Sequence, residues 1–141
     1  MKKILRWSGI TLAAVLVLIQ FIPAARTNPA VESDVFAPDA VTEILRKACY
    51  DCHSHETAWP WYSRVAPVSW WMADHVEHGR GDLNFSRWPL FDLEAQRHLL
   101  GDIEEEVMEG EMPLWSYRLG HPEARLTEEE KETLLNWART R

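Results

Sequence analysis

Cys49-Tyr50-Asp51-Cys52-His53 is the stretch around which the rest of the chain is organised. Two cysteines three positions apart on a helical turn point the same way, so both thiols can add to the vinyl groups along one edge of a porphyrin. The histidine that follows can then give an imidazole nitrogen to the iron under the ring. The motif therefore predicts one covalent haem c, held by thioether bonds to Cys49 and Cys52, with His53 as the proximal iron ligand.

Two other uses of paired cysteines fit this motif less well. A thioredoxin-like Cys-x-x-Cys opens a helix after a β-strand, where the helix dipole lowers a thiol pKa. Here the pair closes an amphipathic helical pattern, and no βαβ pattern surrounds it. A structural zinc site needs further ligands at motif-like spacing. Adding His53 and His55 to the cysteines would supply them, but would leave the aromatic loop and the Met-Pro segment downstream unexplained.

The periodicity of the chain predicts an all-α fold of four or more short helices joined by long loops. A first helix begins at Asp39 as N-cap and continues into the motif, so that both cysteines follow its apolar face. Gly79 is expected to end the second helix. Residues 54–67 and 83–90 are expected to be loops, and no segment shows sustained period-two alternation. The other predicted helices cover residues 68–78, residues 93–109 before Gly110, and the segment that a capping box opens at Thr127.

Met112 is the predicted distal ligand of the iron. It lies in Gly110-Glu111-Met112-Pro113-Leu114, just beyond the third predicted helix. Because Pro113 disfavours helical backbone at the residue before it, the thioether can project from a loop. Ligation by histidine and methionine raises the reduction potential of a haem. The competing interpretation is that Met112 simply fills a gap in the core, as methionine usually does.

Other side chains could take the distal position. His121, in a loop, would give bis-histidine ligation and a lower potential. Met72 and His75 share one helix face and could reach a haem packed there, whereas Met108 is more typical of packing. An open sixth position would indicate a gas sensor or a peroxidase. Three further histidines have neighbours typical of surface residues and are expected to be solvated: His55, His78 and His98.

Residues 1–25 have the pattern of a membrane anchor or a signal peptide. Lys2, Lys3 and Arg6 precede an apolar stretch, and residues 7–25 are 19 in number, close to the ~20 that span a bilayer. The exit at 22–26 has no clean small-x-small cleavage pattern, which favours an uncleaved anchor. The basic end should stay in the cytoplasm. This places the rest of the chain on the outer, periplasmic side of the cytoplasmic membrane, and cleavage would release it into the periplasm.

The remaining chain divides into a polar linker over 26–36 and a haem-binding domain over 37–141. Four of the 15 basic residues lie within residues 1–30, which contain no acidic residue, so the remainder carries 11 basic and 22 acidic residues. Its net charge of about −11 excludes nucleic-acid binding, which needs a basic face. An acidic surface suits a redox partner protein with a basic patch.

Several motifs in the same order resemble the bacterial haem-binding-domain family of small, membrane-anchored, monohaem, cytochrome-c-like proteins. The resemblance covers about residues 36–139 and extends to the N-terminal anchor. It implies a cytochrome-c-like helical fold, covalent haem at Cys49, Cys52 and His53, and Met112 in the matching distal position. The motifs that carry it are residues 49–54, 59–63, 66–70, 75–80, 83–86, 110–114 and 121–124.

These observations together predict a membrane-tethered electron carrier with one haem. Its iron would cycle between Fe(III) and Fe(II), and no substrate chemistry is required, so we do not expect an enzyme. The alternatives are a haem-based redox or gas sensor, a haem-delivery module, and a peroxidase-like enzyme. Rapid binding of CO would favour these alternatives, whereas a six-coordinate haem inert to CO would favour the carrier.

Overall fold

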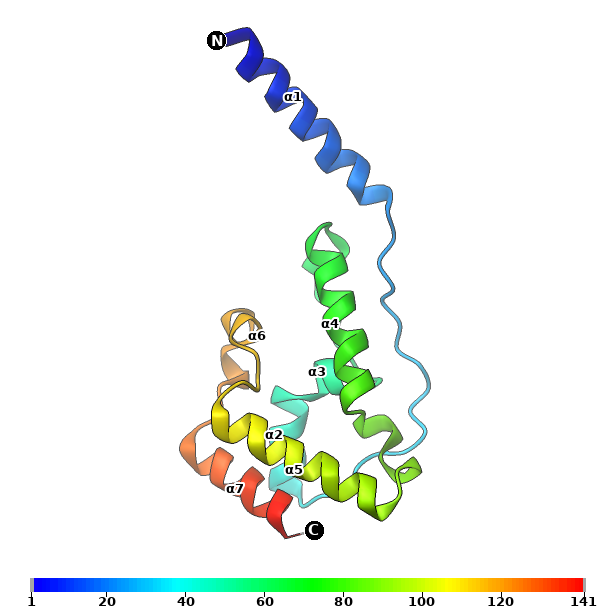
Figure 1. Ribbon diagram of the computed structural model, residues 1–141, viewed down its shortest axis with the longest axis vertical. Helices are drawn as coiled ribbons and strands as arrows, with labels where there is room; N and C mark the ends of the chain where they lie inside the picture. The colour runs from blue at the N-terminus through cyan, green and yellow to red at the C-terminus, as the bar shows by residue number, and fades with distance from the viewer. Residues whose placement is uncertain (1, 141) are drawn as a thin grey trace.

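The computed structural model describes residues 2–140, which contain seven α-helices and four short 3-10 helices (Figure 1). No strand occurs within these residues, so the predicted all-α class is confirmed. The α-helices are α1 (Lys2–Leu18), α2 (Asp39–Ala48), α3 (Tyr50–His53), α4 (Val68–Asp82), α5 (Leu93–Glu109), α6 (Trp115–Gly120) and α7 (Glu128–Arg139). The 3-10 helices are η1 (Ile19–Phe21), η2 (Trp61–Arg64), η3 (Phe85–Leu90) and η4 (Pro122–Ala124).

The core forms where α7 packs against both α5 and α2. Each of these helices carries apolar residues at helical spacing, and burying that face stabilises the helix. We call residues 49–53 the haem motif. Tyr50 of this motif stacks on Phe85 with ring centroids 5.1 Å apart, which joins the motif to the same core. The buried cluster comprises Val35, Val41, Ile44, Leu45, Tyr50, Phe85, Trp88, Leu100, Ile103, Val107, Leu134, Trp137 and Ala138.

The bounds predicted for α5 and the predicted start of α7 are confirmed. Asp92 caps α5 by accepting a hydrogen bond from the N–H of Ala95 at 2.8 Å. Gly110 ends the same helix in the left-handed conformation, with φ of 76°, which a glycine adopts without steric cost. Thr127 and Glu130 form the reciprocal capping box of α7.

The prediction of one continuous helix through the motif is wrong. The helix that begins with Asp39 ends at Ala48, and a second short helix, α3, begins at Tyr50. Cys49 lies between them with φ of −123°, outside helical geometry. The N–H of His53 nevertheless bonds to the carbonyl of Cys49 at 2.9 Å. The motif is therefore a separate helical turn that directly follows α2.

Helix α4 is longer than predicted, because Gly79 lies inside it rather than after its end. A Cβ atom at this position would lie 2.9 Å from the carbonyl oxygen of Cys52, closer than real Cβ contacts. The helix continues to Asp82, after which Leu83 is extended. Gly79 thus permits the close approach of α4 to α3, and the predicted helix stop is corrected accordingly.

Two of the predicted loops contain short helices, and one helix was not predicted. Residues 54–67 include η2, and residues 83–90 are largely η3. Helix α6 has only six residues and follows the buried Pro113. Segments this short show less than two turns, so hydrophobic periodicity cannot reveal them.

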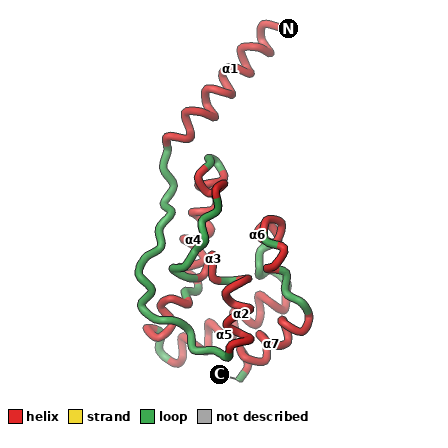
Figure 2. The backbone as a smooth tube through the Cα atoms, turned by 180° about the vertical axis from the view of Figure 1, so that it is seen from behind, coloured by secondary structure: helices red, strands yellow, loops and turns green. Residues whose placement is uncertain are grey.

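The segment between the N-terminal helix and α2 is extended and runs along the domain (Figure 2). Asn28 donates a hydrogen bond to the carbonyl of Thr57 at 2.9 Å, and the N–H of Glu32 donates to the carbonyl of Ser86 at 3.2 Å. Val35 is buried in the core. We call residues 27–35 the strap, because they are bonded to the domain along their length.

Helix α1 and η1 together form a continuous apolar segment, Lys2–Phe21, of 20 residues. This segment projects from the rest of the molecule (Figure 1), and none of its apolar window is buried. It is long and apolar enough to cross a bilayer, as a membrane anchor or as a signal sequence.

The contact between α3 and α4 predicts opposite effects at two glycines of the same helix. Gly79→Ala should lower the free energy of unfolding by about 1–3 kcal/mol, since the added methyl group overlaps the backbone of Cys52. Gly81→Ala is the matched control, because a Cβ there meets nothing within 4 Å. It should raise stability by about 0.5 kcal/mol through the helix preference for alanine. Urea unfolding of both variants measures these changes in the free energy of unfolding. Equal unfolding midpoints would contradict the close approach of α4 to α3 at Gly79.

Candidate haem-binding site

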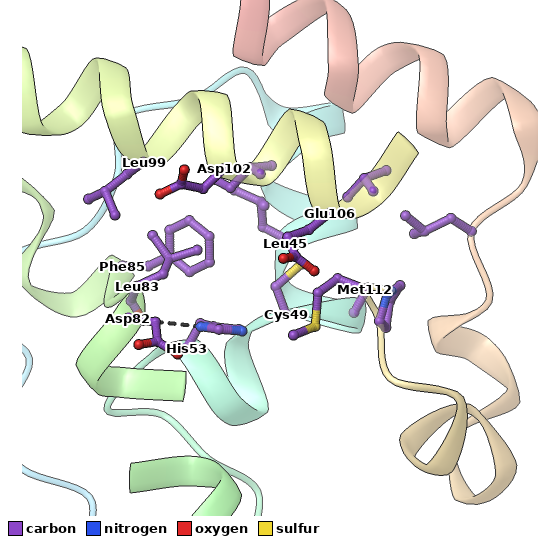
Figure 3. A pocket seen from close by; sticks show the side chains of 15 residues that line it. Leu45, Cys49, His53, Asp82, Leu83, Phe85, Leu99, Asp102, Glu106 and Met112 are labelled. Carbon is purple, nitrogen blue, oxygen red and sulfur yellow. Dashed lines mark hydrogen bonds between the residues drawn. The ribbon is translucent and has the colours of Figure 1, made fainter. Parts of the chain in front are cut away.

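A cavity of about 380 Å³ lies between the haem motif, α5 and the Met112 loop (Figure 3). We call it the main cavity. A neighbouring hollow of about 320 Å³, the side hollow, extends from it toward α4 and α6. The two share six lining residues: Ala48, Cys49, His53, Asp82, Met112 and Pro113. The walls of the main cavity are otherwise mostly apolar, from Leu45, Leu83, Phe85, Leu99, Ile103, Val107 and Leu126, with Asp102 and Glu106 on α5.

His53 enters this space from α3 with one ring nitrogen fixed by the backbone. Its Nδ1 lies 2.8 Å from the carbonyl oxygen of Gly79 and 3.2 Å from that of Leu83, so the Nδ1–H donates to them (Figure 3). The Nε2 atom keeps its lone pair and lies on the side of the ring toward Met112 (Figure 3). Burial lowers the pKa of His53, although the two carbonyls oppose that shift. A neutral imidazole oriented through its other nitrogen is the usual form of a metal-binding histidine.

Both cysteines reach the same space with free thiols. Cys49 lines the main cavity and the side hollow, and Cys52 lines the side hollow. Burial raises the pKa of Cys49 to about 12. Burial, followed by the nearby Asp51 carboxylate, raises the pKa of Cys52 to about 11. A thioredoxin-like pair needs a lowered thiol pKa, so these environments argue against dithiol redox chemistry.

Met112 lies across the main cavity from α3, on the turn that follows α5. The N–H groups of Glu111 and Met112 both bond to the carbonyl of Glu106, at 3.1 and 3.2 Å, and fix this turn. The half-buried side chain of Met112 extends toward His53 (Figure 3), and both residues line the main cavity. The structure therefore brings together Cys49, His53 and Met112, with Cys52 at the adjoining hollow. It stays a prediction that Cys49 and Cys52 attach haem and that His53 and Met112 bind its iron.

The rival ligand His121 lies elsewhere, with both ring nitrogens engaged. Its Nε2 is 3.2 Å from the hydroxyl of Tyr62, and its Nδ1 is 3.0 Å from a carboxylate oxygen of Glu123. Its ring stacks on Tyr117 with centroids 4.2 Å apart. With Met72, it lines a separate hollow of about 100 Å³. Neither side chain lines the main cavity, so the geometry favours Met112 over both.

The remaining rivals are also placed away from the main cavity. His75 lines the side hollow but not the main cavity, and its Nδ1 bonds to the carbonyl of Trp71 at 2.8 Å, within its own helix. Met108 is 61% exposed on α5. Of the methionines and histidines within residues 2–140, only His53 and Met112 line the main cavity.

The expectation that His55 is solvated is wrong. His55 is only 8% exposed, and its Nδ1 lies 2.8 Å from the carbonyl of Ala30 in the strap. Its Nε2 lies 2.9 Å from the side-chain amide of Asn84, so the ring links the strap to the start of η3. His78 and His98 are exposed as predicted, at 73% and 78% of their side-chain surface.

Two further residues support the site, and neither was among the predicted site residues. Asp51, inside the motif, accepts hydrogen bonds from the N–H of Ala58 at 2.8 Å and from the hydroxyl of Tyr117 at 2.7 Å. Burial raises the pKa of Tyr117, so its hydroxyl stays a donor. Asp51 therefore holds α6 and the loop after the motif in place. The sequence shows Asp51 between the two cysteines, but no local pattern indicates its distant partner, Tyr117 on α6.

Arg80 is the second supporting residue. Its guanidinium donates to the carbonyl of Ser54 at 2.7 Å, to the carbonyl of Thr27 at 2.8 Å and to the hydroxyl of Thr57 at 2.9 Å. The planar group can satisfy these acceptors at once, which a lysine could not do. Arg80 therefore joins the strap to the loop behind the motif.

The residues present fit a haem group. The main cavity offers apolar walls for the faces of a macrocycle, a neutral imidazole with its Nε2 free, and a thioether across from it. Two thiols adjoin the same space. Within residues 2–140, no cluster of three or more His, Cys, Asp or Glu side chains could hold a metal ion directly.

Comparison with known proteins agrees with this site. The model of the family described as the haem-binding domain matches residues 14–140, which includes the C-terminal part of the apolar N-terminal segment. No curated protein and no solved structure matches the chain. Since the match covers nearly the whole sequence, the chain belongs to the haem-binding-domain family, and haem is its cofactor.

Proposed function

We propose that this protein is a c-type, monohaem electron carrier tethered to the outer face of the cytoplasmic membrane. The observation that carries the proposal is the pairing of His53 and Met112 at one apolar cavity, beside two free thiols. An imidazole and a thioether on the same iron leave no position for a substrate. When bound, haem supplies a one-electron Fe(III)/Fe(II) couple.

Covalent attachment follows from the thiols of Cys49 and Cys52. Each thiol would add across one vinyl group of haem, its sulfur bonding to one carbon and its hydrogen passing to the other. No oxidant or reductant is needed for this addition. Burial raises the pKa of both thiols, which favours their protonated form. The thioethers would then keep the porphyrin edge beside His53.

The side chains around the cavity would tune the potential of the iron in opposite directions. The thioether of Met112 is a soft ligand that favours Fe(II), and apolar walls disfavour the extra positive charge of Fe(III). The carboxylates of Asp82, Asp102 and Glu106 line the same cavity and favour Fe(III). His53 stays fixed because its Nδ1–H is held by backbone carbonyls, which limits reorganisation during electron transfer.

The proposed location and partner follow from charge. Lys2, Lys3 and Arg6 at the start of the apolar segment would remain cytoplasmic, which puts the haem domain outside. The acidic domain would attract a partner with a basic patch and accelerate encounter at low salt. A haem-based sensor or a peroxidase-like enzyme is the second candidate, and it requires an iron position that Met112 does not occupy.

Haem should stay with the polypeptide after extraction with acidified acetone. This result is expected for thioether bonds, since acid breaks iron ligation but leaves carbon–sulfur bonds intact. Replacing both attachment residues, in Cys49→Ser with Cys52→Ser, should make the haem extractable. Haem that washes out of the unaltered protein would end the claim of covalent attachment.

Met112→Ala should lower the midpoint potential by ~0.1 V or more, within the ~0.8 V range that axial ligands control. It should also abolish the sulfur-to-iron absorption band of the oxidised protein and allow CO to bind the reduced form. Met108→Ala is the matched control, because it makes the same change at an exposed methionine. Unchanged spectra in Met112→Ala, with altered spectra in His121→Ala, would assign the sixth position to His121 instead.

A further inference from the structure

Two segments at one end of the domain contain no acidic residue. Residues 57–73 and 112–122 contain none of the 22 Asp and Glu residues but five of the eight tryptophans. Their basic residues are Arg64 and Arg118. The first segment includes η2 and the first turn of α4, and the second includes α6. Figures 1 and 2 both show these elements at the end of the domain toward α1, whereas α5 and α7 lie at the far end.

Large apolar side chains are exposed at this end of the molecule. Trp61, Trp115 and Leu119 are 77%, 69% and 68% exposed. Single exposed apolar residues are normal, but a group of them marks a surface that contacts something apolar. We define the apolar tip as Trp61, Val65, Val68, Trp71, Trp115 and Leu119, all of them exposed.

The end of the N-terminal apolar helix is hydrogen-bonded to residues 63–70, which lie among the apolar-tip residues in the sequence. Gln20 donates to the carbonyl of Ala66 at 3.1 Å and accepts from the N–H of Ala66 at 2.9 Å. The indole N–H of Trp70 donates to the carbonyl of Ile22 at 3.2 Å. Arg26 donates to the carbonyl of Ser63 at 2.8 Å. The domain is thus attached to the exit of the apolar helix, rather than hanging from a free linker.

This attachment fixes the height of the apolar tip above a bilayer. A 20-residue segment reaches about as far as the ~30 Å hydrocarbon core, so Gln20 and Ile22 would lie at the outer interface. Ala66 and Trp70, bonded to them, would lie at the same depth. Tryptophan is enriched at this level of membranes, because its apolar ring and polar N–H suit the headgroup region.

We propose that the apolar tip lies in the outer headgroup layer of the membrane as a second contact beside the N-terminal helix. The occupant is the lipid surface, with the indole rings among the headgroups and Arg64 and Arg118 near lipid phosphates. This contact holds the domain upright and turns its acidic end, with α5 and α7, toward the aqueous side where a basic partner would bind. The inference rests on the proposed membrane anchoring.

Nitroxide spin labels in the full-length holoprotein test this contact. Trp61→Cys and Leu119→Cys each place one label on the apolar tip, while Leu93→Cys, at an equally exposed position (70%) in the first turn of α5, is the matched control. The protein is placed in phosphatidylcholine and phosphatidylglycerol vesicles. Collision of each label with oxygen, which concentrates in lipid, is compared with collision with a water-soluble nickel complex.

The labels at 61 and 119 should collide more with oxygen than with the nickel complex, and the label at 93 should show the reverse. Labels at 61 and 119 that behave like the one at 93 would overturn the proposal. So would labels shielded from both reagents, which would indicate that a second copy covers the apolar tip. Extraction of the vesicles at alkaline pH separates the two claims. Protein lost from them contradicts the anchor itself, whereas retained protein with aqueous labels contradicts only the apolar tip's contact.

Discussion

One backbone contact organises the site: the approach of helix α4 to the haem motif at Gly79. The missing side chain lets the helix come within reach of the backbone of Cys52. The carbonyl of the same glycine accepts the Nδ1–H of His53. A single residue therefore sets the distance between two helices and the orientation of the imidazole. Any larger residue would move the acceptor away from the ring and the helix away from the motif.

The apolar and the acidic surfaces of the molecule lie at opposite ends of the domain, on either side of this contact. At one end are the apolar helix and the indole-rich surface, which comes from two segments without acidic residues. At the other end are α5 and α7, whose packing closes the core and whose exposed faces are acidic. The main cavity lies between them, with Met112 delivered by the turn that Gly110 permits. The same few helices thus form the core, carry the acidic surface and line the cofactor site.

The sequence predicted the features that depend on neighbouring residues. The capping box at Thr127, the end of α5 at Gly110 and the helical class all follow from local patterns, and all are confirmed. The errors concern contacts between distant segments. Gly79 looked like a helix stop because its partner, the backbone of Cys52, is invisible in a local pattern. His55 looked like a surface residue because its partners lie in the strap and at Asn84, 29 positions away.

X-ray absorption at the iron edge tests most directly whether the iron is held between an imidazole and a thioether. In the oxidised and reduced holoprotein, the account predicts one sulfur neighbour and five nitrogen neighbours, four of them from the porphyrin and one from His53. A spectrum that fits six nitrogens without sulfur would contradict the account, because the iron would then be held by a second histidine. A five-coordinate iron would contradict it as well, since the position assigned to Met112 would then be open.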